Sequence, residues 1–150
     1  MGVKEILEFV KVEHTLFSLP FILIGYIHAH NQFLEELSSD SSWVSFDIIW
    51  ILIAAVGARG LAMTLNRIID RDIDAHNPRT ASRHLVRGSV TIQTAWGLAV
   101  VFLIMLLFSA WQLNEVALMM AWLPVLAFVI YPYTKRYTWG CHLWLGLCLG

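Results

Sequence analysis

Long runs of apolar residues, separated by short polar connections, dominate the pattern of the chain. A transmembrane α-helix needs about 20 predominantly apolar residues. Four runs approach that length, and they cover residues 15–33, 46–65, 90–110 and 116–133. A fifth run begins near Trp139 and is cut at Gly150, which leaves about 12 residues, too few to span a membrane. We therefore expect an all-α, polytopic transmembrane helix bundle with about four complete spans and a truncated fifth.

Positive charge is confined to alternate connections between these runs. Lys4 and Lys11 precede the first run, and Lys135 and Arg136 follow the fourth. The connection between the second and third runs is the most basic, and it contains Arg67, Arg71, Arg79, Arg83 and Arg87. Nine of the ten basic residues therefore lie on one side of the membrane. The positive-inside rule makes this side cytoplasmic, and we expect a multi-pass protein of the cell (inner) membrane.

Composition agrees with lipid as the natural solvent. Hydrophobic residues make up 58% of the 150 residues and charged residues 14%, against about 45–50% and about 25% in soluble domains. The formal net charge of −1 excludes a basic protein that coats nucleic acid. The two cysteines are too few for a disulfide scaffold. Because no linker or internal repeat is visible, residues 1–150 are expected to form the N-terminal part of a single transmembrane domain.

Polar side chains line one face at the end of the second predicted helix. Asn66, Asp70 and Asp74 are four residues apart, so each is displaced by about 40° around the helix axis from the one before. Arg59 returns to nearly the same face, whereas Asp72 points elsewhere. Ionisable groups at membrane depth are costly and usually functional. A solvated, salt-bridged helix end is the simpler alternative.

These side chains combine metal-binding and phosphate-binding groups. Two carboxylates and an amide oxygen suit Mg²⁺, which is commonly held by one or two carboxylates together with waters and substrate phosphates. The guanidinium groups of Arg59, Arg79 and Arg83 can grip phosphate oxygens bidentately. The pattern predicts a bridging metal and a polyanion. Ion transport is disfavoured, because polar groups at one end of one helix give no continuous path across the membrane.

The fourth predicted span ends in a polar and aromatic segment, residues 131–136. If helical turns persist past Pro132, Tyr131 and Lys135 share a face and can reach one cavity. An interfacial aromatic belt with snorkelling cations explains the same segment. His14, at the cytoplasmic entry of the first span, could also face the site, although an interfacial role is the simpler explanation.

Three segments of the chain resemble the UbiA superfamily of intramembrane aromatic prenyltransferases. They are the run Asn66-x-x-x-Asp70-x-x-x-Asp74 with its continuation at residues 77–83, the opening residues 13–21, and residues 131–136. The first of them resembles the first aspartate-rich motif of that family. The likeness runs along all 150 residues, and it is strongest to the quinone-biosynthesis branch, the 4-hydroxybenzoate polyprenyltransferases and the related futalosine-pathway enzymes.

This resemblance implies a bundle of nine transmembrane helices around a cavity, with two aspartate-rich motifs facing each other at its cytoplasmic end. It implies that Mg²⁺ held by these motifs binds the diphosphate of an isoprenyl donor, and that an aromatic ring carbon attacks the allylic cation. The implied substrates are a polyprenyl diphosphate and an aromatic acid such as 4-hydroxybenzoate. Carried over by motif, the metal ligands are Asn66, Asp70 and Asp74; the diphosphate contacts are Arg59, Asn66, Arg79, Arg83 and Lys135; and the catalytic residues are Asp70, Asp74, Tyr131 and Lys135.

The chain departs from the family pattern in two places. It ends inside the fifth span, before the second aspartate-rich motif, which the family carries between its sixth and seventh helices. We therefore expect the C-terminal half of the same bundle as a partner, and we expect the 150-residue chain alone to be inactive. His84 stands where a proline is common in the family. Two alternatives remain open: haem farnesylation, which shares the Asn/Asp motif, and a non-catalytic half that binds a partner protein in the membrane.

Overall fold

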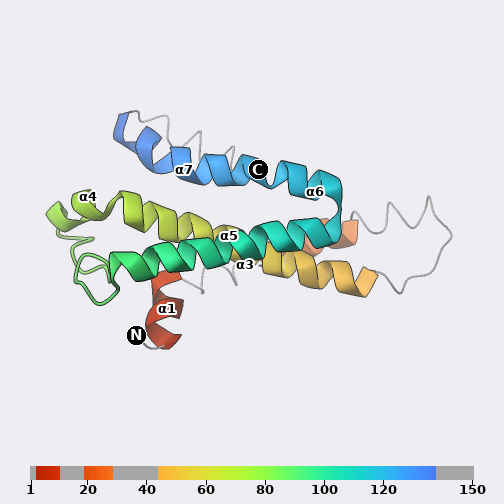
Figure 1. Ribbon diagram of the computed structural model, residues 1–150, viewed down its shortest axis with the longest axis horizontal. Coiled ribbons are helices and arrows are strands. Elements are labelled where there is room, and N and C mark those ends of the chain that lie inside the picture. Colours follow the sequence, from red (N-terminus) through yellow and green to blue (C-terminus); the bar gives the residue numbers. More distant parts are fainter. Residues whose placement is uncertain (1–2, 11–18, 29–43, 138–150) are drawn as a thin grey trace.

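The computed structural model describes residues 3–10, 19–28 and 44–137, and every regular element in these ranges is an α-helix (Figure 1). The helices are α1 (Val3–Val10), α3 (Val44–Ile69), α4 (Arg71–His76), α5 (Ile92–Leu113), α6 (Glu115–Met120) and α7 (Trp122–Tyr137), with a further helix over Leu19–His28. Among the described residues, three segments are long and apolar enough to cross a membrane, namely Phe46–Ile69, Ile92–Leu113 and Glu115–Thr134. The all-α transmembrane fold predicted from the sequence is thereby confirmed.

The second and third predicted spans correspond to α3 and α5, but the fourth is divided. Its first part, α6, ends at Met120, and α7 begins at Trp122. Pro124 explains the interruption, because it has no N–H to donate to the carbonyl of Met120 and its ring crowds that carbonyl. The first predicted span contains the shorter apolar helix Leu19–His28. The flanks of that helix and the fifth run near Trp139 lie outside the described residues.

Two glycines of α3 set its close approach to α5. A Cβ atom on Gly57 would lie 2.9 Å from the backbone nitrogen of Leu106, and one on Gly60 would lie 2.5 Å from the ring of Phe102. Small residues of this kind let transmembrane helices approach each other closely. The buried side chains of Phe102 and Leu106 then fill the space around the contact. The result is a tight helix pair that fixes the position of the C-terminal end of α3.

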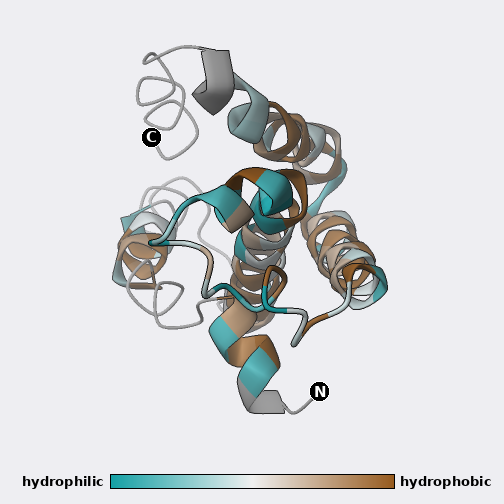
Figure 2. Ribbon diagram, turned by 90° about the vertical axis from the view of Figure 1, so that its left-hand side faces the viewer, coloured by the Kyte–Doolittle hydropathy of each residue, from teal (hydrophilic) through white to brown (hydrophobic). Residues whose placement is uncertain are grey.

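The ends of several helices meet at one end of the bundle, at the left of Figure 1. The helices α3 and α7 run toward this end, α5 starts from it, and α4 lies there with the loop of residues 77–90. At the opposite end Asn114 reverses the chain, and its side chain accepts a hydrogen bond of 2.7 Å from the backbone N–H of Ala117 to start α6. Hydrophilic residues gather in α4 and the loop, whereas the long helices behind them are mostly hydrophobic (Figure 2). We call this end, comprising residues 66–90 and the last turns of α7, the polar end.

The outward faces of the long helices are apolar. On α5 the exposed side chains include Trp96, Val100, Ile104 and Trp111, which recur at intervals that place them along one side of the helix. Such a continuous apolar surface is unfavourable in water. It suits acyl chains or further helices of a membrane bundle, so the long axis of the bundle is expected to cross the bilayer.

Candidate functional site

Asn66, Asp70 and Asp74 lie on one face across the junction of α3 and α4. Asp70 stands between Ile69, the last residue of α3, and α4, with φ −88° and ψ 3°. Helical hydrogen bonds continue through the junction, because Asp70 N donates to Asn66 O at 3.0 Å and Asp74 N donates to Asp70 O at 2.8 Å. Asp70 and Asp74 are only 1% and 5% exposed, whereas Asp72 is exposed. The carboxylates at four-residue spacing therefore face inward together.

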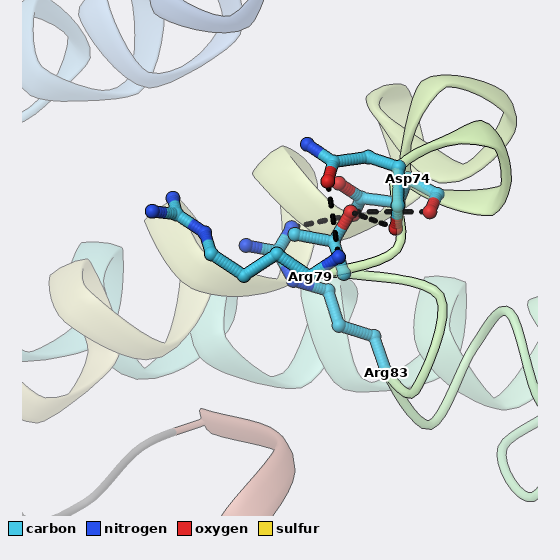
Figure 3. A network of polar contacts seen from close by, with 5 residues as sticks. Asp74, Arg79 and Arg83 are labelled. Carbon is cyan, nitrogen blue, oxygen red and sulfur yellow. Dashed lines mark hydrogen bonds and ion pairs between the residues drawn. The ribbon is translucent and has the colours of Figure 1, made fainter.

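Arg83 forms an ion pair with Asp74 (Figure 3). Its Nη1 atom lies 2.5 Å from Oδ2 of Asp74, and the side chains are 32% and 7% exposed, respectively. The backbone carbonyl of Asp74 also accepts a hydrogen bond of 3.1 Å from Oγ1 of Thr80. Hydrogen bonds between charged groups are stronger than those between neutral ones. These contacts attach the loop to α4 and place a guanidinium group directly beside one predicted metal ligand.

The loop after α4 is folded into consecutive turns that return Arg83 to Asp74. Oδ1 of Asn77 accepts a hydrogen bond of 3.0 Å from the backbone N–H of Arg79, an arrangement that favours a turn. Asn77 O accepts from Thr80 N at 2.9 Å, and Thr80 O accepts from Arg83 N at 3.0 Å. The side chain of Arg79 is exposed and extends away from this network (Figure 3). The structure thus brings Arg83 to the carboxylate and leaves the Arg79 guanidinium apart from it.

Three polar side-chain atoms of α3 are buried without a hydrogen-bond partner in the described part of the chain, and one of them is Oγ1 of Thr64. The other two belong to predicted site residues. They are Nε of Arg59 and Oδ1 of Asn66. Buried polar groups normally have partners, and one that lacks a partner calls for an explanation such as a bound ligand. Arg59 lies about 10 Å deeper along the helix than Asn66, as expected for a separation of seven residues. The predicted site residues Arg59 and Asn66 therefore have unused hydrogen-bonding capacity on the side of the carboxylates that faces the middle of α3.

The helix α7 continues through Pro132 to Tyr137, so the condition for Tyr131 and Lys135 to share a face is met. Tyr131 is half-buried, and its carbonyl accepts a hydrogen bond of 2.9 Å from Oγ1 of Thr134. Since α7 packs along α3, Tyr131 belongs to the polar end of the bundle. The side chain of Lys135 and the whole of His14 lie outside the part of the chain that the structure describes.

Arg67 is a buried residue of this region that the sequence pattern marked only as part of a basic connection. It is 7% exposed, and its guanidinium carbon lies 4.8 Å from the centre of the Phe9 ring in α1. Its spacing of seven residues from Asp74 could have indicated that Arg67 lies on the same side of the helix as the predicted site, because residues seven apart return to nearly the same helix face. The contact with Phe9 depends on how α1 packs, and no local pattern reveals it.

The oxygen atoms of Asn66, Asp70 and Asp74 fit Mg²⁺ bound together with waters and phosphate oxygens. Carboxylate and amide oxygens are the hard ligands that this ion prefers, and Oδ1 of Asn66 is buried and has no hydrogen-bond partner among the described residues. Within the described ranges no group of three or more His, Cys, Asp or Glu side chains is arranged to hold a metal. Mg²⁺ bound in this way keeps several waters and is held by one or two carboxylates and substrate phosphates rather than by a closed protein cage.

Comparison with known proteins finds curated relatives of this chain. A 4-hydroxybenzoate octaprenyltransferase from Coxiella burnetii is 35% identical over 104 residues, which are 69% of this chain and 36% of that protein. A protein of the same name from Shewanella loihica is 32% identical over 100 residues, which are 67% of this chain and 35% of that protein. The chain thus matches about a third of the length of these curated relatives.

A solved structure has the same fold. The apo structure of a UbiA homologue from Aeropyrum pernix K1 aligns with a TM-score of 0.76 and 38% sequence identity, covering 91% of this chain and 46% of that one. The chain therefore spans less than half of the solved homologue. A model of the UbiA prenyltransferase family matches residues 18–150, which include all three candidate spans and the whole polar end. This match, together with the shared fold, shows that the chain belongs to the UbiA prenyltransferase family.

Proposed function

We propose that the chain is part of an Mg²⁺-dependent enzyme that transfers a polyprenyl group from an isoprenyl diphosphate to a carbon of an aromatic acid. The observation that carries this proposal is the helix face that holds the buried carboxylates of Asp70 and Asp74 and the buried Oδ1 atom of Asn66, with Arg83 paired to Asp74, at the polar end of a membrane bundle. Carboxylates and guanidinium groups together match a metal ion and a diphosphate, which carry opposite charges. Family membership supports a prenyl diphosphate as the anion.

The proposed roles follow from the chemistry of each side chain. Asn66, Asp70 and Asp74 would hold Mg²⁺, which when bound supplies positive charge that binds the diphosphate and favours its departure. Arg83 is partly exposed and lies at the edge of the carboxylates, so its guanidinium group can reach phosphate oxygens. The half-buried ring of Tyr131 would line the cavity beside the allylic cation, because the face of an aromatic ring attracts positive charge. Further diphosphate contacts are proposed for Arg59, Arg79 and Lys135.

The helices of the bundle would exclude water from the allylic cation. Closing a site against water prevents hydrolysis of a reactive intermediate, and the apolar faces of the long helices provide such surroundings. The distribution of basic residues supports a position in the inner membrane with the polar end in the cytoplasm. A soluble aromatic acid and the diphosphate head group would then reach the site from the cytoplasm.

The names of the relatives support the choice of substrates. Two relatives are named 4-hydroxybenzoate octaprenyltransferase, so 4-hydroxybenzoate is the first acceptor to test, within ubiquinone or menaquinone biosynthesis. Because the chain covers 46% of the solved homologue, the proposal requires the rest of the family bundle to supply the facing second motif. The 150 residues alone are accordingly proposed to be inactive.

The test compares two aspartates that are two residues apart and differ in burial. In membranes that contain the full-length protein, Asp70→Asn is expected to lower Mg²⁺-dependent transfer of a radiolabelled polyprenyl group to 4-hydroxybenzoate by about 100-fold or more. Asp72→Asn, a change of the same kind on the exposed face, is the matched control and is expected to retain activity. Near-normal turnover of Asp70→Asn contradicts the metal-ligand role.

The same assay separates the alternatives. Product formed from protohaem in place of the aromatic acid favours haem farnesylation. Failure of the full-length protein with either acceptor favours a non-catalytic membrane protein. Product formed by the purified 150-residue chain contradicts the requirement for the rest of the bundle.

A further inference from the structure

The loop that carries Arg83 is supported on both sides of this residue. On the side of α4, Oγ1 of Thr80 donates a hydrogen bond of 3.1 Å to the carbonyl of Asp74. On the side of α5, the side chains of Leu85 and Val90 are 3% and 1% exposed and belong to the hydrophobic core cluster. Because loops usually move more than the elements that they connect, the position of Arg83 depends on how firmly these supports hold.

His84, the residue after Arg83, is the point at which the second support closes. Its backbone carbonyl accepts hydrogen bonds of 3.2 Å from the N–H of Val90 and 3.1 Å from the hydroxyl of Ser89. Gly88 makes this closure possible, because its φ of 75° lies in the left-handed region, which residues with a side chain rarely adopt. The segment from His84 to Val90 is therefore a closed turn, and Arg83 is attached directly to its first residue.

The N-terminal helix α1 contacts this closed turn from outside the loop. Oε2 of Glu8 lies 3.5 Å from Nε2 of His84, and the two side chains are 54% and 26% exposed, respectively. The next residue of α1, Phe9, is completely buried and belongs to the same core cluster as Leu85. The polar contact therefore lies beside a buried apolar cluster to which α1 and the loop both contribute.

We propose that His84, held by Glu8 of α1, is a positioning residue that keeps the Arg83 guanidinium group beside the carboxylate of Asp74, where it meets the diphosphate. This inference rests on the proposed function, since it gives the pair of Glu8 and His84 a part in diphosphate binding. A group that is already held where its ligand binds loses less conformational freedom on binding than a mobile one, so the contact raises the affinity for the diphosphate. The sequence marked His84 only as a departure from the family pattern, and the contact with Glu8 gives that departure a role.

The contact should affect the loop more than the stability of the fold. An exposed ion pair contributes little to the free energy of unfolding, so changes of either partner are expected to leave the protein folded. In the full-length protein, purified in lipid nanodiscs with Mg²⁺ in excess, calorimetric titration with inorganic pyrophosphate should show about threefold weaker binding for Glu8→Gln and for His84→Ala. Glu115→Gln, a change of an exposed glutamate at the opposite end of the bundle, is the matched control and should bind like the wild type.

The double variant tests whether the two residues act through each other. Glu8→Gln combined with His84→Ala should bind pyrophosphate no more weakly than His84→Ala alone, because the contact is already lost in the single variant. Additive losses, or wild-type affinity in both single variants, overturn the proposal.

Hydrogen exchange reports on the loop without the use of a ligand. The backbone N–H groups of Arg83, Val86, Arg87 and Val90 donate hydrogen bonds within the loop. They should exchange about threefold faster in Glu8→Gln and His84→Ala, whereas N–H groups in the middle of α3 and α5 should exchange at the wild-type rate. An equal acceleration in the loop and in these helices indicates general destabilisation and overturns the proposal.

Kinetics separate this positioning role from the proposed function itself. The KM for the prenyl diphosphate should rise by about threefold in both single variants while the KM for the aromatic acid stays unchanged, and an equal rise in both constants overturns the proposal. Failure of the proposed function has a different signature, in which the wild-type protein transfers no prenyl group. In that case the exchange rates and the pyrophosphate titration still decide whether Glu8 and His84 position Arg83.

Discussion

Replacing Gly60 by alanine places a methyl group against the ring of Phe102. The added Cβ would lie 2.5, 2.6 and 2.7 Å from three ring carbons, well inside the normal contact distance between carbon atoms of about 3.5–4.0 Å. Phe102 is buried between α3 and α5, so the ring cannot turn freely out of the way. Either the ring leaves its preferred rotamer or the two helices separate.

The expected cost follows from two opposing effects. Overpacking of a well-packed core costs about 1–3 kcal/mol, while alanine is favoured over glycine within a helix by about 0.5–1 kcal/mol. Gly60→Ala should therefore lower the free energy of unfolding by about 1–2 kcal/mol. Gly97→Ala in α5 is the matched control, because a Cβ there meets no atom within 4 Å. That control should be neutral or slightly stabilising.

Reversible unfolding of the purified protein in mixed detergent micelles measures these values. A double-mutant cycle adds Phe102→Leu, which removes part of the ring that the new methyl group meets. The double variant should then be less destabilised than the sum of the two single changes, by about 1 kcal/mol. Additive effects, or equal behaviour of Gly60→Ala and Gly97→Ala, would refute the explanation that glycine is needed here for close helix packing.

Three further predictions concern the polar end and its supports. Arg83→Gln should raise the KM for the prenyl diphosphate by about tenfold or more, because it removes the partly exposed guanidinium group at the carboxylates. Arg87→Gln changes an exposed residue of the same loop and should leave this KM unchanged. Equal effects of the two changes would contradict the proposed contact between Arg83 and the diphosphate. A cysteine introduced at the exposed Asn77 should react with a membrane-impermeant maleimide from the cytoplasmic side, and labelling only from outside would reverse the proposed orientation. Thr91→Ala should lower the free energy of unfolding by about 1 kcal/mol in the same unfolding assay. The reason is that the Thr91 side chain caps the start of α5 by accepting a hydrogen bond of 3.2 Å from Thr94 N. Unchanged stability would show that this cap contributes little.

The sequence predicted those features that depend on local pattern. Apolar runs located α3 and α5 to within a few residues, because an uninterrupted run of this length has few alternatives in a membrane. Four-residue spacing predicted that Asp70 and Asp74 share a face and that Asp72 does not, since helical phase is set by hydrogen bonds between residues four apart. The division of the fourth span was missed, although Pro124 was visible, because a proline near a helix start is compatible with an unbroken span.

Contacts between distant segments could not be predicted in the same way. Both Arg79 and Arg83 were candidates in the sequence, and only the turns of the loop bring Arg83 to Asp74 while Arg79 points away. The contact of Arg67 with Phe9 joins residues from α3 and α1, and nothing in the phase of either helix specifies it. The choice among several arginines therefore depended on tertiary structure rather than on spacing.

The polar end is best understood as a single electrostatic unit assembled from separate segments. The carboxylate of Asp74 forms an ion pair with Arg83 from the loop. The helix α1 contacts Arg67 of α3 through Phe9, and it contacts the loop through Glu8 and His84. Interactions within such a network are not additive, because each partner changes the electrostatic environment of the others. A change in α1 should consequently alter anion binding at the aspartate-rich motif even though it touches none of the proposed metal ligands. Residues 66–74 are therefore expected to depend on their contacts with the N-terminal helix as well as on their own sequence.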